Sequence, residues 1–395
     1  MHRKHRIRRM SIAQPQKVAV IGAGIAGAAC AQAVSKAGYS VHVFDKSRGP
    51  GGRLATRRVE WLDRHGQWCE TPLDHGAVSI TAHSPAFQSF VRQAVAAGSL
   101  AEWRPLLAPG SALLDGGGPH YLPVPDMPAL ARSLLDGSAA TWSAVVEGLH
   151  KGPLGWQVQA GGQQVGGPFD TVVLALPPAQ AAPLLNPHRR DWAQLASAEL
   201  MKPCWTMMGV AAATDDLRGW DLARPPKGVL AWVVRNDARP GRTHVPGQAH
   251  WVLHASAGWS RRHFEQPAAW IQSQMQAALA EWLGRPVDWH HGVVHRWRYA
   301  APQMSSAAPA GTCWWDAAAG LGVCGDFLGN SGVEGAWLSA QSLATALLQS
   351  SRAAAAPASA VRTVASATES SSAPRHVTPL ISLHPDPSQS QRSFP

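Results

Sequence analysis

Residues 17–27 read KVAVIGAGIAG, and this stretch decides the fold. Its first five residues are mostly β-branched or small apolar residues and predict a buried strand, and the small residues that follow predict a helix to about Ala37. Between them, Gly22 permits a tight turn, Gly24 lets the backbone approach a pyrophosphate, and Gly27 lets the helix lie close to the strand. The stretch therefore predicts a βαβ unit that binds a dinucleotide.

An acidic residue at the end of the next expected strand, residues 40–44, supports this interpretation. Asp45 lies 21 residues beyond Gly24, where a carboxylate can accept hydrogen bonds from an adenosine ribose and would repel a 2′-phosphate. The pyrophosphate would lie at the helix N-terminus, where unpaired N–H groups and the helix dipole favour anions. These features favour a dinucleotide site over an ordinary glycine-rich turn, but they do not distinguish FAD from NAD.

A second glycine loop follows directly, where residues 46–54 read KSRGPGGRL. A plain NAD-binding domain needs no such loop at this position. The pattern from Arg48 to Arg53 resembles the flavin-binding signature of the amine-oxidase-like flavoproteins. That resemblance implies that the loop backbone and an arginine run along the diphosphate and ribityl chain of FAD. An ordinary turn with solvated arginines is the alternative, and the complete dinucleotide motif before it makes that alternative weaker.

Two later segments fit the same superfamily. Residues 169–178 read FDTVVLALPP, a strand like its second nucleotide-side strand, and residues 321–348 read as a strand, Gly325-Asp326, a loop and a helix from about Val333. The resemblance implies that Asp326 binds the ribityl or phosphate region and that the helix N-terminus faces the flavin pyrimidine ring. A helix N-terminus there would stabilise the negative charge that arrives with hydride. A turn or capping acid is the alternative for Asp326.

The chain from Val18 to Leu348 resembles the bacterial renalase-like FAD-dependent oxidoreductases. The segments that carry the resemblance are VHVFDKSRGPGGRLATRR, LDHGA, MKPCW, HWVLHASAGWSRRHF, VVHRWRYAAP and VCGDFLGNSGVEGAWLS. Membership implies oxidation of 2- or 6-dihydro isomers of NAD(P)H to NAD(P)+, with hydride transfer to FAD and reoxidation by O2 to give H2O2. No cysteine lies where membrane amine oxidases attach flavin, so we expect non-covalent FAD. An amine oxidase or desaturase-like enzyme of the same fold is the alternative.

The motifs and the resemblance together assign the cofactor site. Its expected residues are Gly22, Gly24, Ile25, Ala26, Gly27, Asp45, Lys46, Arg48, Gly52, Arg53, Gly76, Ala77, Val146, Ala175, Gly325, Asp326, Val333, Glu334, Gly335 and Ala336. Where related sequences carry Gly-Ala-Gln-Tyr-Phe-Thr, residues 76–81 read GAVSIT, so a polar and an aromatic group expected near the flavin are replaced. This change leaves FAD binding untouched and bears on the substrate.

The substrate site is expected on two strands with alternating side chains. Residues 250–254 place His254 on one face with His250, and residues 293–299 place Trp297 on one face with Tyr299. Aromatic and imidazole side chains would form a flat slot for a nicotinamide ring, with arginines for its phosphates. The candidate phosphate contacts are Arg261, Arg262 and Arg296.

We take His254, Tyr299, Trp297 and Arg296 as the candidate catalytic residues. A dihydropyridine releases hydride without a proton to remove, so positioning groups are expected rather than a base. The chain holds 18 Trp and 18 His, so an ordinary core position is the alternative for each of these rings.

Charge and cysteine content restrict the partners. The net charge is +10, but residues 1–16 and 351–395 carry nine basic and two acidic residues, leaving +3 on the middle of the chain. We therefore expect a small-molecule substrate and O2 as partners, no nucleic acid and no membrane, and a monomer or homodimer. Five scattered cysteines without a CxxC pair argue against a disulfide framework and against a zinc site, so no metal is expected. They fit a reducing, cytoplasmic location.

The basic N-terminus has two interpretations. Arg8-Arg9 followed by an apolar run from Val18 resembles an export signal, whereas the alternative is an upstream extension with Met10 as the true start. Cleavage of a signal would remove the glycine motif, and the run is shorter than the roughly 20 residues that span a membrane. We favour the extension.

The expected fold class is α/β, a discontinuous Rossmann-type FAD-binding domain with an inserted α+β substrate domain. Residues 17–82, 136–185 and 318–350 are assigned to the FAD-binding domain, and residues 83–135 and 186–317 to the substrate domain. Residues 1–16 are expected to be a disordered basic extension. Residues 351–395 are rich in Ala, Ser and Pro and are expected to be a disordered tail.

Overall fold

The computed structural model describes residues 16–63, 65–112, 118–214, 219–303, 313–329 and 332–355. The described residues up to Ala353 belong to one compact unit. The predicted N-terminal extension lies outside the described residues apart from Gln16, and most of the predicted tail also lies outside them. The last helix runs to Ala355, so residues 351–355 are helical where a disordered tail is expected.

A six-stranded sheet forms the nucleotide side of the fold, with strand order β17-β18-β11-β1-β2-β7. Its strands are β1 (Lys17–Ile21), β2 (Ser40–Phe44), β7 (Ala139–Thr141), β11 (Thr171–Leu174), β17 (Trp314–Asp316) and β18 (Leu321–Val323). All neighbouring pairs are parallel except β17 with β18. The predicted strands 17–21 and 40–44 are confirmed to the residue. The Rossmann-type sheet predicted from the glycine motif is thus present.

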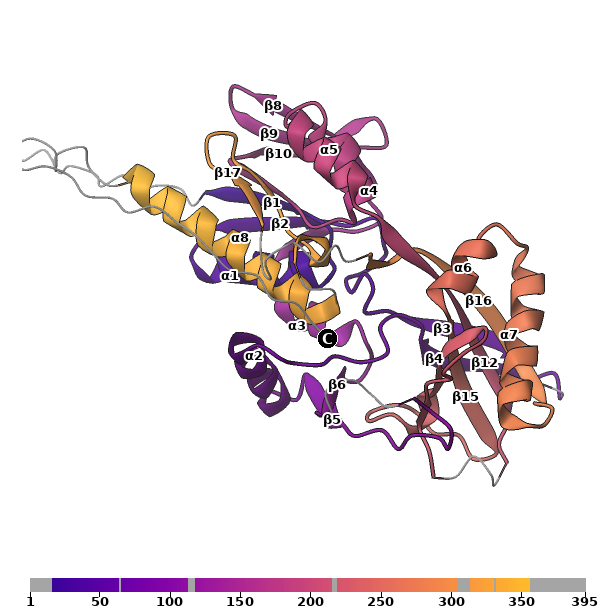
Figure 1. Ribbon diagram of the computed structural model, residues 1–395. Helices are drawn as coiled ribbons and strands as arrows, with labels where there is room; N and C mark the ends of the chain where they lie inside the picture. Colours follow the sequence, from indigo (N-terminus) through magenta and orange to yellow (C-terminus); the bar gives the residue numbers. More distant parts are fainter. Residues whose placement is uncertain are drawn as a thin grey trace, which may run out of the picture. The chain divides into compact units, whose positions relative to one another are not determined.

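Both faces of this sheet are covered. Val18 and Val20 of β1 pack into one hydrophobic cluster with helices α1 (Ile25–Lys36) and α8 (Gly332–Ala355). Ala19 and Ile21 face a second cluster on the other side. Figure 1 shows α1 and α8 on one side of the sheet and a smaller layer on the other. That layer consists of β8 (Val146–Gly152), β9 (Gly155–Ala160), β10 (Gln163–Phe169), α4 (Pro178–Leu185) and α5 (Arg190–Ala198). Because both faces are buried, β1 is apolar at every position after Lys17.

A five-stranded antiparallel sheet forms the other half, with strand order β13-β14-β15-β12-β16. It consists of β12 (Met201–Ala212), β13 (Leu222–Ala223), β14 (Leu230–Arg235), β15 (Gln248–Ala255) and β16 (Trp289–Pro302), and it packs with α6 (Ala257–Arg262) and α7 (Ala268–Leu283). β15 is a central strand, and every residue from Ala249 to Ala255 is buried. The expected alternation along residues 250–254 therefore does not separate a buried face from an exposed one.

Shorter elements complete the fold. They are the hairpin β3 (Thr56–Leu62) and β4 (Trp68–Asp74), the pair β5 (Leu100–Trp103) and β6 (His120–Pro123), helices α2 (Pro85–Ala96) and α3 (Ala129–Leu134), and the single turns η2 (Asn236–Ala238) and η3 (Asp326–Leu328). Among the described helices, none has the length and apolar character needed to cross a membrane. The predicted domain boundaries stay a prediction. Five strands of the six-stranded sheet come from the three separated stretches assigned to the FAD-binding domain, but β17 comes from residues assigned to the substrate domain.

Candidate functional site

A cavity of about 1200 Å³ is lined by both glycine loops, by the ends of β2 and β11, and by residues of β12, β15 and β16. It therefore reaches from the six-stranded sheet to the five-stranded one. The glycine motif lies at one end, which we call the nucleotide end. The rings of His254, Trp297 and Tyr299 lie at the other, which we call the ring end.

Each glycine of the first loop has the environment that its predicted role requires. Gly22 has a φ of +106°, and a Cβ there would lie 2.4 Å from the Ala175 carbonyl oxygen. A Cβ on Gly27 would lie 1.8 Å from the Gly22 oxygen, so only glycine lets α1 pack there. A Cβ on Gly24, by contrast, would meet nothing within 4 Å. Gly24 lines the cavity and is the N-cap of α1, so the open space beside it is where an anion can reach the helix N-terminus.

The second glycine loop lies directly against the first. The Gly51 N–H donates to the Ala23 carbonyl at 2.9 Å, and Gly24 and Gly51 form an isolated parallel bridge. A Cβ on Gly52 would lie 3.1 Å from the Cα of Gly24. The two loops thus form one wall of backbone, and this explains why the chain needs glycines in both.

Asp45 connects the same two loops. Its carboxylate accepts the Ala23 N–H at 2.6 Å and the Ser47 N–H at 2.7 Å. Each oxygen keeps a lone pair for a further donor, and the residue lines the cavity. The geometry is therefore compatible with the predicted ribose contact, which stays a prediction.

Arg53 and Asp326 join the second glycine loop to the last motif of the chain. The guanidinium donates to both carboxylate oxygens, at 2.6 and 2.8 Å, and also to the Ala300 carbonyl on β16 at 3.2 Å. The Asp326 side chain is 3% exposed and the Arg53 side chain 34% exposed. A buried carboxylate in a bidentate pair is strongly held, so Asp326 is more than a turn residue.

These residues fit FAD. The nucleotide end offers a helix N-terminus without a side chain in front of it, a carboxylate beside it, and the cations Lys46 and Arg53 in the lining. The open space beside Gly24 is the space that a Cβ at this position would fill. A diphosphate needs such an anion site, and the apolar and aromatic ring end suits an isoalloxazine.

Most of the predicted cofactor residues line the cavity. They are Gly22, Gly24, Ile25, Ala26, Asp45, Lys46, Gly52, Arg53, Gly76, Ala77, Val146, Ala175, Gly325, Asp326, Val333 and Ala336. Four others do not. Gly27 packs against Gly22, Gly335 is buried at the start of α8, and Arg48 is exposed outside the cavity.

Glu334 is the fourth, and its carboxylate has a structural partner instead. It accepts the backbone N–H of His83 at 2.8 Å and of Ser84 at 2.7 Å, and Ser84 is the N-cap of α2. The carboxylate therefore holds the start of α2 against α8 and is not directed at the cavity.

All four predicted catalytic residues line the ring end. Their neighbours are His295, which the strand pattern places on one face with Trp297 and Tyr299, and His75, which the sequence analysis did not single out. The Trp297 indole N–H donates to the His75 carbonyl at 2.9 Å, and the two rings stack with centroids 5.2 Å apart. His295 meets Trp297 edge-on at 4.5 Å. His75 follows Asp74 within the LDHGA segment, so that motif was the signal that could have identified it. Cys204, Trp232 and Arg298 also line the cavity.

Burial keeps the His75 and His254 imidazoles and the Cys204 thiol uncharged near neutral pH. Desolvation, followed by the nearby His295, lowers the pKa of His75 to about 3. Desolvation, followed by the charge of Arg239, lowers the pKa of His254 to about 4. Burial raises the pKa of the Cys204 thiol to about 11. In the described part of the protein, His254 Nε2 is buried without a hydrogen-bond partner.

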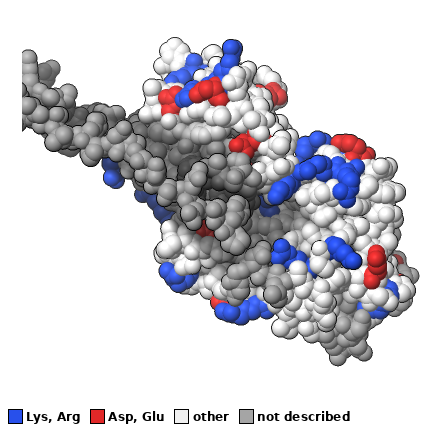
Figure 2. All heavy atoms as spheres, in the orientation of Figure 1, with Lys and Arg blue, Asp and Glu red and all other residues white. Residues whose placement is uncertain are grey.

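Arginines lie at the outer edge of the ring end. Arg296 is exposed and donates to the Phe264 carbonyl at 3.0 Å and to the Glu265 carboxylate at 2.8 Å. Arg298 lies over the Phe264 ring at 4.7 Å. Arg261 and Arg262 are exposed on α6 and do not line the cavity. Figure 2 shows basic side chains gathered on the part of the surface where α6 lies in Figure 1.

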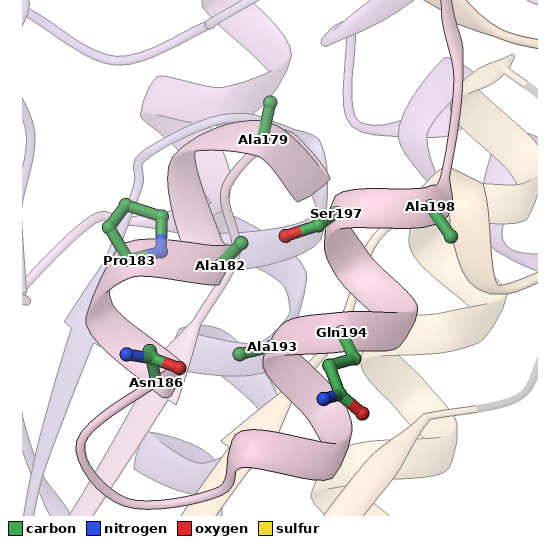
Figure 3. A pocket seen from close by; sticks show the side chains of 8 residues that line it. All are labelled: Ala179, Ala182, Pro183, Asn186, Ala193, Gln194, Ser197 and Ala198. Atoms are coloured by element: carbon green, nitrogen blue, oxygen red, sulfur yellow. The ribbon is translucent and has the colours of Figure 1, made fainter.

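A second hollow lies between α4 and α5, with a volume of about 770 Å³ (Figure 3). Its lining consists of Ala179, Ala182, Pro183, Asn186, Ala193, Gln194, Ser197 and Ala198. None of these side chains is titratable, and we assign it no chemistry.

Comparisons with known proteins agree with this geometry. Residues 20–94 match the model of the NAD(P)-binding Rossmann-like domain, and residues 97–348 match that of the flavin-containing amine oxidoreductases. The chain belongs to the flavin-containing amine oxidoreductase family. Within that family it is an FAD-dependent oxidoreductase.

Solved structures share the fold at low identity. A putative protoporphyrinogen oxidase from Exiguobacterium sp. 255-15 is similar with a TM-score of 0.62 and 10% identity, over 84% of this chain and 98% of that one. Cyclohexylamine oxidase from Brevibacterium oxydans IH-35A has a TM-score of 0.59 and 13% identity, over 86% of this chain and 100% of that one. A putrescine oxidase mutant has a TM-score of 0.59 and 15% identity, over 85% and 99%. At these identities the similarity concerns the fold alone.

Non-covalent attachment of FAD is expected, because Cys204 is the one cysteine among the described lining residues and its raised pKa makes it a poor nucleophile. Acid precipitation of the yellow protein should release the flavin into the supernatant. Flavin absorbance that stays with the precipitate, and that survives proteolysis as a flavopeptide, would contradict this.

Proposed function

We propose that the protein oxidises 2- or 6-dihydro isomers of NAD(P)H to NAD(P)+, passing hydride to FAD, with O2 as the final acceptor and H2O2 as product. The observation that carries the proposal is the charge of the ring end. Its histidines and thiol are uncharged near neutral pH, and its charged residues Arg296 and Arg298 are cationic. Among the described residues, the one carboxylate that lines it is Asp326, which Arg53 holds. A protonated amine would find no free anion there, whereas a neutral dihydropyridine needs none.

The polarity of the ring end supports the same substrate class. Trp297, Tyr299 and Trp232 offer flat apolar surface, and the neutral imidazoles of His75 and His254 in the same lining suit an uncharged polar group. A nicotinamide ring is flat and carries one such group, its carboxamide. Arg296 would meet the phosphates, for which it must leave Glu265.

FAD supplies the hydride acceptor when it is bound. The residues of the chain bind and orient the donor. Trp297 is held by its bond to the His75 carbonyl, so its ring is oriented before the donor binds. The backbone of His254 pairs with both β12 and β14. No general base is required, because hydride loss from a dihydropyridine leaves an aromatic pyridinium without proton removal.

Anaerobic mixing with candidate donors tests the proposal. We expect 2- and 6-dihydro NAD(P) isomers to bleach the flavin absorption band, and NADH and a panel of amines to leave it unchanged. Readmission of O2 should restore the band and yield one H2O2 for each donor oxidised. The fold is shared with two amine oxidases, so bleaching by amines alone would establish the amine oxidase alternative instead.

The proposed phosphate contact can be tested separately. Arg296→Gln should raise KM for a dihydro dinucleotide by about tenfold, a typical loss for one charge-assisted contact, with little change in kcat. A dihydronicotinamide riboside, which lacks phosphate, should react equally well with both proteins. Arg92→Gln, which changes an exposed arginine on α2, is the matched control. An equal loss on both donors would argue against phosphate recognition by Arg296.

The remaining assignments concern the surroundings of the enzyme. We propose a cytoplasmic monomer or homodimer, without nucleic-acid or membrane partners. The support is the charge distribution and the five cysteines, which are all unpaired in the structure.

A further inference from the structure

Three charged side chains are buried together where the end of β4 meets the segment between η2 and β15. The Asp74 carboxylate accepts Arg239 Nη1 at 2.9 Å and Arg242 Nε at 2.7 Å. The side chains of Asp74, Arg239 and Arg242 are 0%, 1% and 2% exposed. One carboxylate facing two guanidinium groups leaves this cluster with one net positive charge. We call it the Asp74 cluster.

No other described anion neutralises the cluster. The second Asp74 oxygen accepts the Thr56 hydroxyl at 2.6 Å, and Arg242 Nη1 donates to the neutral Pro125 carbonyl at 3.0 Å. The acid nearest in sequence, Asp237, is paired with Arg235 at 2.7 Å. Arg239 Nε and Arg242 Nη2 have no partner within the described residues. The excess charge is therefore uncompensated. The side chains that carry it are buried away from water, and in that low-dielectric environment a charge acts over a longer distance.

The cluster lies directly behind the wall of the ring end. Arg239 Nη2 donates to the carbonyl of Val78, and Asp74 immediately precedes His75 in the chain. His75, Gly76, Ala77 and Val78 all line the cavity. The charge of Arg239 also reaches His254, which lines the ring end, and lowers the pKa of its imidazole.

We propose that the excess positive charge of the Asp74 cluster stabilises the negative charge that bound FAD gains on reduction, and so sets its reduction potential. Oxidised FAD takes up two electrons and one proton and becomes an anion. A fixed positive charge near that anion favours the reduced form, and its orientation costs nothing at the moment of transfer. The buried imidazoles cannot supply this charge, because they are neutral. The inference requires bound FAD and is independent of which donor the enzyme oxidises.

Arg242 is the residue to change. Arg242→Gln removes one charge but leaves the Asp74–Arg239 pair and the contact of Arg239 with Val78, so the position of the loop is kept. Arg242→Lys keeps the charge and loses the planar hydrogen-bonding geometry. The probe is sulfite, an anion that adds reversibly to oxidised flavins and bleaches their absorption band, and it needs no substrate.

We expect Arg242→Gln to weaken sulfite binding on the order of tenfold, the effect of one charge in a partly buried site, and Arg242→Lys to bind sulfite like the parent protein. The midpoint potential of bound FAD, measured against a reference dye during slow reduction, should fall with Arg242→Gln. A tenfold change in the equilibrium of a two-electron couple corresponds to about 30 mV.

Asp74→Asn tests the opposite sign. It raises the net charge of the cluster by one, so sulfite should bind more tightly and the potential should rise. Arg58→Gln removes an exposed arginine on β3 and should change neither. If Arg242→Gln binds sulfite like the parent, or if Arg242→Lys weakens sulfite as much as Arg242→Gln does, the charge of the cluster does not act on FAD. Should Asp74→Asn fail to fold, the two Arg242 variants still decide the question.

Discussion

A Gly24→Val protein is expected to fold and to be colourless. Gly24 has a φ of −71°, which valine adopts readily, and a Cβ there meets no protein atom within 4 Å. That space faces the cavity at the N-terminus of α1, where the FAD diphosphate must come within hydrogen-bonding distance of the backbone. A branched side chain occupies the position of the diphosphate and removes the closest approach. We expect FAD affinity to fall at least about 100-fold, equivalent to about 2.8 kcal/mol.

Gly27→Val is the contrasting variant. Its Cβ would lie 1.8 Å from the Gly22 oxygen, a backbone atom that cannot move without distorting β1 and α1. The cost exceeds the roughly 1–3 kcal/mol typical of overpacking, and the variant should be insoluble or unfolded.

The measurements are the ratio of flavin to protein absorbance, far-UV circular dichroism and FAD titration of the apoprotein. The expected pattern is native secondary structure without flavin for Gly24→Val, and loss of structure for Gly27→Val. A yellow Gly24→Val protein with the parent's FAD content would show that the cofactor does not lie against the first glycine loop.

The nucleotide end was predictable because its determinants are local. Gly22, Gly24 and Gly27 act within six residues of chain, and each role follows from backbone geometry that a sequence pattern specifies. Strands β1 and β2 are short apolar runs next to turn residues, so their ends coincide with the predicted ones. Because Asp45 follows β2 directly, predicting the end of that strand also predicted the position of Asp45.

The ring end was less predictable because it is made by pairing between distant strands. Cys204 and His254 meet because β12 pairs with β15, a register that no local pattern specifies. Glu334 was expected near FAD, yet it binds the backbone of residues 83 and 84, which lie about 250 residues earlier in the chain. The Asp74 cluster likewise joins residues 165 and 168 positions apart. Such partners follow from tertiary packing, and one sequence without an alignment does not contain them.

Acid sensitivity is the second large effect that we expect, and it arises from His75 and His254. Their pKa values are about 3 and about 4 in the folded protein, against 6.5 for an ordinary histidine. At a pH between the folded-state pKa of each histidine and 6.5, the unfolded chain binds more protons than the folded one. The free energy of unfolding therefore falls as the pH decreases below 6.5. At pH 5 each histidine removes about 2 kcal/mol of unfolding free energy relative to neutral pH, since one pKa unit corresponds to 1.36 kcal/mol.

Urea unfolding at pH 7.5 and pH 5.0, with FAD at a fixed saturating concentration, measures this loss. The parent protein should lose about 4 kcal/mol from the two histidines together, with a further contribution from His295, whose pKa burial also lowers. His254→Gln cannot be protonated, so its loss between the two pH values should be smaller than the parent's by about 2 kcal/mol. His150→Gln, at an exposed position on β8, is the matched control and should lose as much as the parent.

If His254→Gln loses as much stability on acidification as the parent and the control do, then the His254 imidazole is not held in its neutral form. The pKa of His254 in the folded protein would then be close to the ordinary value of 6.5, and the acid sensitivity would have to arise elsewhere in the fold.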